Sequence, residues 1–155
     1  MTPPGLARYI EFMQTLDGQR LADLPDVVTE DVEFRDPFNH LRGARDLERC
    51  LREMLEQVGD LCIEVTHVGA LESLTTGTET VWCLRWNFSG KLVRLGGRPW
   101  DVPGMSEVTL AADGRVQRHI DYWDAAQGLY ETLPVVGSLQ RWLRRRLAVP
   151  GIRQL

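Results

Sequence analysis

The spacing of the apolar residues changes near Gly59, and this change most limits what the chain can fold into. Before Gly59 most of them recur with the 3.6-residue period of an amphipathic helix, and after it they alternate with polar residues as in strands. Helices before strands, without repeated alternation of the two, are typical of an α+β domain. In this first part we expect helices at 6–16, 20–28 and 43–58, and one early strand at 32–35.

The second part of the sequence reads as a series of strands separated by turn signals. Gly96-Gly97 and Asp113-Gly114 are dipeptides that favour tight hairpins. Strands that follow one another through short turns pair antiparallel. The expected strands are 61–70, 78–88, 91–95, 98–110 and 116–123, with further turns at 76–77 and 89–90. The predicted fold is therefore a curved antiparallel sheet packed on about three N-terminal helices.

Residues 125–155 form a predicted helical extension of the domain at 1–124. Helices are expected at 125–133 and 136–148, separated by Pro134. The second helix is amphipathic, with four arginines opposite an apolar stripe that includes Trp142. Such a helix makes weak contact with a membrane surface, or it covers another apolar surface of the protein while its arginines stay solvated.

Length and charge exclude several functional classes. At 155 residues the chain can bury one core, so we expect one site per subunit. The formal charge of −4 argues against binding to nucleic acid, because such binding depends on neutralising phosphates. The three cysteines show neither disulfide nor zinc spacing, and no segment resembles a signal peptide or a membrane span. We therefore expect a cytoplasmic protein.

Two segments carry a resemblance to a known family. The first runs from Thr29 to Phe38, with an Asp-Pro turn followed by Arg42-Gly43. The second joins the turn at 113–116 to the final strand at 119–124. Both are similar to the SnoaL-like branch of the nuclear transport factor 2 superfamily, which has a ketosteroid-isomerase-like fold. The tail resembles a bacterial subgroup whose members are mostly of unknown function.

The resemblance implies a cone-shaped domain in which helices and the concave side of the sheet enclose an apolar pocket. The fold does not choose the chemistry, because it is shared by isomerases, polyketide cyclases, epoxide hydrolases and binding modules. Each candidate residue has to be judged by its own surroundings.

Three residues are candidate acid/base groups. Asp36 and Asp121 stand where members of the family place catalytic carboxylates, and His119 shares a strand face with Asp121. A carboxylate in an apolar pocket is costly to ionise, which suits a general acid or base. The alternatives are that Asp36 belongs to a turn and that Asp121 forms a salt bridge in solvent with Arg118 or Arg85.

Further residues are expected to line the pocket. Tyr9 resembles the tyrosine that donates to the steroid oxyanion in ketosteroid isomerases, but Ser106 stands where a protonated aspartate would complete that site. Authentic steroid isomerase activity is therefore not expected. Phe34 and Trp123 are expected to add apolar surface, on the first and last strands.

The strand at 78–88 has one aromatic face and one polar face. Trp82, Trp86 and Phe88 share the first, and Cys83, Arg85 and Asn87 share the second. Sequence logic alone buries the aromatic face. The resemblance instead implies an outward aromatic face that forms a homodimer interface, with the three polar-face residues in the pocket. Asn87 stands where epoxide hydrolases have a carboxylate, which argues against that mechanism.

No metal or cofactor is expected. His40 and His67 stand alone without metal-ligand spacing, and no glycine-rich phosphate loop lies between a strand and a helix. The sequence thus favours a pocket for a small hydrophobic molecule with a carbonyl or hydroxyl group. If the protein is an enzyme, it is a cofactor-free isomerase, cyclase or hydrolase that uses carboxylates for proton transfer. The alternatives are a non-catalytic ligand- or lipid-binding module and an epoxide-hydrolase-like enzyme.

Overall fold

The computed structural model describes residues 1–74, 79–125, 138 and 142. Its contacts divide the chain into two units, 1–123 and 124–155, and the elements below belong to the first unit. The α-helices are α1 (Pro4–Gln14), α2 (Leu24–Val27) and α3 (Ala44–Gln57), and short 3-10 helices lie at Arg20–Asp23 and Val93–Leu95. The strands are β1 (Val28–Arg35), β2 (His40–Arg42), β3 (Val58–Leu71), β4 (Val81–Leu92), β5 (Arg98–Leu110) and β6 (Val116–Trp123).

All six strands form one sheet in the order β2-β1-β6-β5-β4-β3. Strands β3 to β6 pair antiparallel in chain order, which confirms the expected meander. Strand β1 departs from the expectation because it pairs parallel with β6, while β2 pairs antiparallel with its outer edge. The long connection through helices and hairpins allows this parallel pairing. It places the ends of β1 and β6 side by side.

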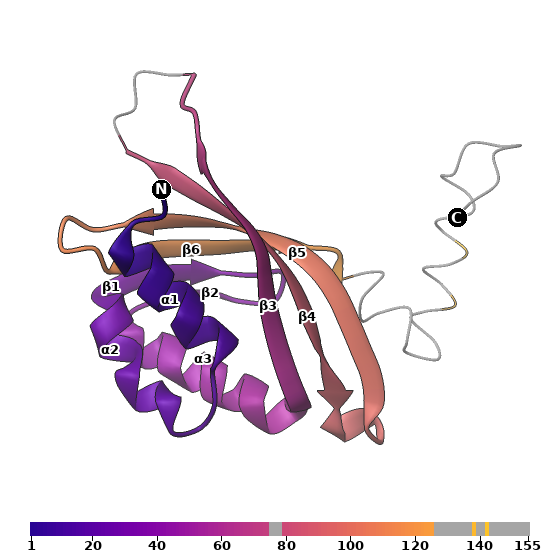
Figure 1. Cartoon of the computed structure of the whole chain (residues 1–155). Helices are drawn as coiled ribbons and strands as arrows, with labels where there is room; N and C mark the ends of the chain where they lie inside the picture. The colour runs from indigo at the N-terminus through magenta and orange to yellow at the C-terminus, as the bar shows by residue number, and fades with distance from the viewer. Residues whose placement is uncertain (75–78, 126–137, 139–141, 143–155) are drawn as a thin grey trace, which may run out of the picture. The chain divides into compact units, whose positions relative to one another are not determined.

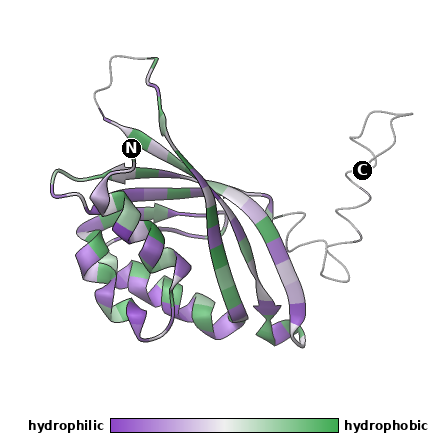
Figure 2. Ribbon diagram, in the orientation of Figure 1, coloured by the Kyte–Doolittle hydropathy of each residue, from purple (hydrophilic) through white to green (hydrophobic). Residues whose placement is uncertain are grey.

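The helices gather on one side of the curved sheet, as Figure 1 shows. Apolar and polar segments alternate along α1 and α3 in Figure 2, as expected for helices with one buried face. The core contains Leu6 and Phe12 of α1, Leu47 and Leu51 of α3, and Val108 of β5, all 4% exposed or less. The predicted α+β fold, with its curved sheet on three helices, is confirmed.

One expected turn is absent. Ser89-Gly90 was expected to end a strand, but β4 continues through it to Leu92. A Cβ on Gly90 would lie 2.4 Å from Cγ1 of Val58 on the neighbouring strand. This glycine therefore marks a close approach within the sheet, which is the other common reason for a glycine inside a strand. The turns at Gly96-Gly97 and Gly114 are confirmed, with all three glycines at φ between 70° and 85°.

The predicted helices at 125–133 and 136–148 lie outside the described residues, except for Ala125, Ser138 and Trp142. Among the described residues, no helix is long and apolar enough to cross a membrane.

Candidate functional site

The ends of β1 and β6 bring two carboxylates together. In the parallel pairing, Phe34 faces His119 and Arg35 faces Ile120. One residue further along each chain come Asp36 and Asp121. Neighbouring strands lie about 4.8 Å apart, so the two aspartates are neighbours although 85 residues separate them.

His119 connects Asp121 to helix α1. Its Nε2 lies 2.6 Å from Oδ1 of Asp121, and its Nδ1 lies 2.7 Å from the hydroxyl of Tyr9. The His119 side chain is only 5% exposed and that of Asp121 is 18% exposed. The Phe34 ring packs on the imidazole at a centroid distance of 5.4 Å. The expected grouping of Tyr9, Phe34, His119 and Asp121 is therefore present.

These contacts are consistent with one arrangement of protons. An ionised Asp121 accepts a hydrogen bond from Nε2–H of His119. The neutral imidazole then has a lone pair on Nδ1, which accepts the hydroxyl proton of Tyr9. Each donor meets one acceptor, so the chain Tyr9–His119–Asp121 is fully satisfied without a charge on the histidine.

Tyr9 is held in its neutral form. Burial raises the pKa of its phenol well above the ordinary value, and the negative charge of Asp121 raises it further. In the proton arrangement described above, its hydroxyl donates to Nδ1 of His119. This differs from the oxyanion-donor role that the family resemblance implied for Tyr9, because its hydrogen bond is already used within the protein.

Asp36 forms a turn with the residues that follow it. Its Oδ1 accepts hydrogen bonds from the backbone N–H groups of Phe38 at 2.7 Å and Asn39 at 2.6 Å. The Asn39 side-chain amide lies 3.1 Å from both carboxylate oxygens. This is the turn alternative considered for an Asp-Pro pair. Both oxygens of Asp36 are thus engaged in the local turn.

The pKa of the Cys50 thiol, on α3, is raised by burial and by both carboxylates. Burial raises the pKa of its thiol, and the charges of Asp36, Glu53 and Asp121 raise it further, in that order. Helix α3 therefore brings Cys50 within electrostatic reach of both aspartates. No signal in the sequence distinguishes this cysteine, since it has the helical spacing of an ordinary core residue.

Aromatic side chains continue from Asp121 along the same face of the sheet. The Trp123 ring contacts Phe38 at a centroid distance of 5.3 Å and Trp100 at 5.7 Å, and Trp100 contacts Phe88 at 4.8 Å. The indole Nε1 of Trp100 is buried and has no hydrogen-bond partner within the part of the chain that the structure describes. This leaves a buried donor on the apolar surface beside Trp123.

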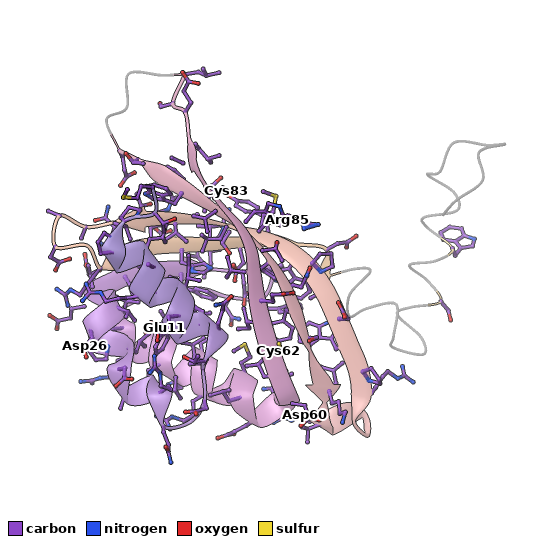
Figure 3. The ribbon with its side chains drawn as sticks, viewed as in Figure 1. Glu11, Asp26, Asp60, Cys62, Cys83 and Arg85 are labelled. Carbon is purple, nitrogen blue, oxygen red and sulfur yellow. The ribbon has the colours of Figure 1, made fainter. Side chains whose placement is uncertain are left out.

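The orientation of β4 corrects part of the expected pocket. Trp86 Nε1 donates a hydrogen bond to Ser106 Oγ, which contacts Asp121, so Trp86 lies on the same face as the candidate site. Cys83, Arg85 and Asn87 therefore lie on the opposite face, and Figure 3 shows Cys83 and Arg85 on the side of β4 away from the helices. Burying the larger apolar side chains removes more apolar surface from water, which explains the orientation. The expectation that these three residues line the pocket is wrong.

The same orientation bears on the expected dimer interface. Trp86 and Phe88 are 8% and 9% exposed within the single chain, and Trp82 on the same face is half-buried. Trp86 and Phe88 therefore have little surface left for a contact between two copies, and the homodimer through this face stays a prediction.

Sequence reasoning did not select the hydrogen bonds around Ser106. This residue is 1% exposed and faces Asp121 across the β5–β6 pair. Ser106 was considered only because it replaces an aspartate of the resembled family. The available signal was local: Gly104 and Ser106 are small residues in a strand whose other buried residues are larger, which leaves room for a neighbouring side chain.

Within the described segments, no group of three or more histidine, cysteine, aspartate or glutamate side chains is arranged to hold a metal ion. The groups around Asp121 are instead suited to hydrogen bonding and proton transfer.

The comparisons with known proteins agree with this fold. The model of the SnoaL-like domain matches residues 9–119, so this chain belongs to the SnoaL-like family. The matched segment begins at Tyr9 and ends at His119, the two residues joined by the hydrogen bond described above. No curated protein matches the sequence at a significant level.

Solved structures with the same fold include proteins with different names. An NTF2-like protein of unknown function from Exiguobacterium sp. 255-15 is 20% identical with a TM-score of 0.64, covering 77% of this chain and 98% of its own. A protein named as a SnoaL-like polyketide cyclase from Jannaschia sp. CCS1 is 19% identical with a TM-score of 0.62, covering 82% and 92%. An epoxide hydrolase of M. tuberculosis is 17% identical with a TM-score of 0.63, covering 92% and 96%. At these identities the likeness shows the fold alone.

Proposed function

We propose that this protein binds a small hydrophobic molecule with a carbonyl group and transfers a proton at the carbon beside it, as an isomerase or cyclase does. Asp121 is the base in this proposal. The observation that carries it is that His119 and Ser106 both contact Oδ1 of Asp121. The second oxygen, Oδ2, has no partner within the described residues. A partly exposed carboxylate with one free oxygen can accept a proton from a ligand.

The surrounding residues support the proposed ligand class. Trp123, Trp100 and Phe88 supply an apolar surface on the Asp121 side of the sheet. In this proposal a carbonyl oxygen that reaches the buried indole N–H of Trp100 relieves the cost of its unmet donor. In the proposed step, a C–H proton moves to Oδ2 of Asp121, and the electron pair of that bond passes to the ligand as an enolate.

A non-catalytic binding module, which the same fold supports, is the rival function. The epoxide-hydrolase alternative is less well supported, because Arg85 and Asn87 lie on the opposite face of β4 from Asp121. A cytoplasmic location also remains part of the proposal.

Hydrogen–deuterium exchange of 2-tetralone distinguishes catalysis from binding. This small ketone has acidic protons at C1, and NMR in deuterated water measures their loss without knowledge of the natural substrate. The native protein should accelerate the exchange over buffer, and Asp121→Asn should abolish the acceleration while the ketone still binds. Binding without acceleration in the native protein would favour the binding module, and failure to bind would contradict the proposed ligand class.

A further inference from the structure

A second branch of hydrogen bonds reaches Asp121 from β4. Trp86 Nε1 donates to Ser106 Oγ at 2.7 Å, and the Ser106 hydroxyl donates to Oδ1 of Asp121 at 2.5 Å. An indole N–H can only donate, so Trp86 occupies an acceptor position of Ser106 and leaves its proton for the carboxylate. The direction of the branch is therefore fixed by the chemistry of its first member.

Gly104 allows this branch to form. It faces Trp86 across the β4–β5 pair, and a Cβ at this position would lie 2.2 Å and 2.3 Å from two carbons of the indole ring. Contacts this short are sterically excluded, so a side chain at Gly104 would displace the ring. The glycine thus provides the surface on which the Trp86 ring rests.

The two branches hold Asp121 from two sides. His119 approaches from within β6 and Ser106 from β5, and both contact Oδ1. Rotation of the carboxylate would exchange its two oxygens, and it would break both hydrogen bonds. Two donors on the same oxygen therefore keep Oδ2 in one place, where it has no partner among the residues that the structure describes.

We propose that Trp86, Ser106 and Gly104 form a positioning unit that fixes the Asp121 carboxylate and reserves Oδ2 as its proton-accepting atom. The proposal rests on the function proposed above, in that Asp121 is the base. Trp86 and Gly104 act through Ser106 and need not touch the ligand. The other ionisable groups near Asp121 are Tyr9 of α1, Asp36 after β1, Cys50 of α3 and His119 of β6.

A purely structural role for Trp86 makes a different prediction. The residue is 8% exposed, so it also fills space in the core. Trp86→Phe keeps an aromatic ring on Gly104 but removes the N–H donor. Ser106→Ala removes the second link with almost no change in volume. The matched control is Trp82→Phe, which changes an indole on the same face of β4 that has no hydrogen bond to Ser106.

The first measurement is independent of catalysis. The Asp121 carboxyl carbon, labelled with carbon-13 and assigned with Asp121→Asn, is titrated by NMR. Loss of a donor to the charged carboxylate makes protonation easier, so Ser106→Ala should titrate at higher pH than the native protein. Trp86→Phe should move the titration in the same direction by a smaller amount, and Trp82→Phe should leave it unchanged. An unchanged titration in both Ser106→Ala and Trp86→Phe would overturn the proposal.

The second measurement is the exchange of 2-tetralone protons. Ser106→Ala and Trp86→Phe should lower kcat for exchange by about ten- to a hundredfold, because small misplacements of a reacting group cost rates of this order. KM of Ser106→Ala should change little, whereas its melting temperature should fall, because the buried Trp86 N–H loses its acceptor. A normal kcat in both variants would overturn the positioning role. If the native protein catalyses no exchange but the titrations move as expected, the proposed function fails and the positioning of Asp121 stands.

Discussion

Asp36 follows β1, Asp121 lies near the end of the neighbouring strand β6, and both are carboxylates, yet the protein engages them differently. Asp36 uses both oxygens in its own turn, and within the described residues its carboxylate accepts hydrogen bonds from residues 38 and 39. Asp121 uses one oxygen, with partners from β5 and β6. The comparison teaches that proximity to a site does not make a carboxylate available: what matters is which of its lone pairs the fold has already used.

The largest expected effect is a difference in catalytic activity between variants of the two carboxylates. Asp121→Asn should lower the rate of 2-tetralone exchange by about 10²- to 10⁴-fold, which is the usual contribution of a general base. Asp36→Asn should have a small effect, because it keeps the oxygen that accepts the turn hydrogen bonds. We expect the rate to change less than about threefold, which corresponds to well under 1 kcal/mol. Equal losses in the two variants would show that the carboxylates act as a pair.

A side chain at Gly104 should lower the stability of the protein and disturb Asp121 but not Asp36. Gly104→Ala forces the Trp86 ring to move and should lower the free energy of unfolding by about 1–3 kcal/mol, as overpacking of a core does. It should also disturb the Asp121 carboxyl signal in the NMR titration but leave that of Asp36 in place. Gly69→Ala is the matched control, because nothing lies within 4 Å of a Cβ at that strand position. Equal stability of the two variants would contradict the close contact between Gly104 and Trp86.

The free energy of unfolding at high pH should depend on the ionisation of Tyr9, which contacts the His119 beside Asp121. The pKa of Tyr9 is raised in the folded protein, so the folded state keeps its proton above pH ~10 while the unfolded state loses it. This contribution is complete below pH ~10 and is lost as the pH rises, by about 1.4 kcal/mol per pH unit. Denaturant unfolding between pH 9 and 11 should show a shallower decline in Tyr9→Phe than in the native protein. Parallel declines would indicate that Tyr9 ionises readily in the fold.

The smallest expected effect compares the charges of the two aspartates at Cys50. Asp36 raises the pKa of this thiol more than Asp121 does. Alkylation at pH 8, followed by peptide mass spectrometry, should therefore be faster in Asp36→Asn than in Asp121→Asn, and slowest in the native protein. The increases should stay below the tenfold that corresponds to one pKa unit. Exposed Cys62 provides the internal control in each sample. A larger increase in Asp121→Asn would reverse the assigned order of the two charges.

Much of the fold followed from local patterns in the sequence. The helical stripe at 43–58 and the glycine turns at 96–97 and 114 were predicted close to their observed positions, because these signals depend on residues near one another in the chain. The turn predicted at Gly90 is wrong, because this glycine instead permits a close approach to Val58 on another strand. The sequence shows where a glycine lies in a strand pattern. Only the neighbouring strand shows whether that glycine forms a turn or allows two strands to approach closely.

The sequence by itself determined that His119, Asp121 and Trp123 share one face of a strand, because alternation is a property of the strand alone. Only the tertiary structure decided that this face meets Trp86 rather than Arg85, since burial depends on which face the helices cover. It also decided that Asp36 is engaged by its turn, while Oδ2 of Asp121 has no partner in the part of the chain that the structure describes. The physical reason is that a hydrogen bond has a direction and a length of about 3 Å, and the donors that meet Asp121 come from positions 15 residues and 2 residues away in the chain.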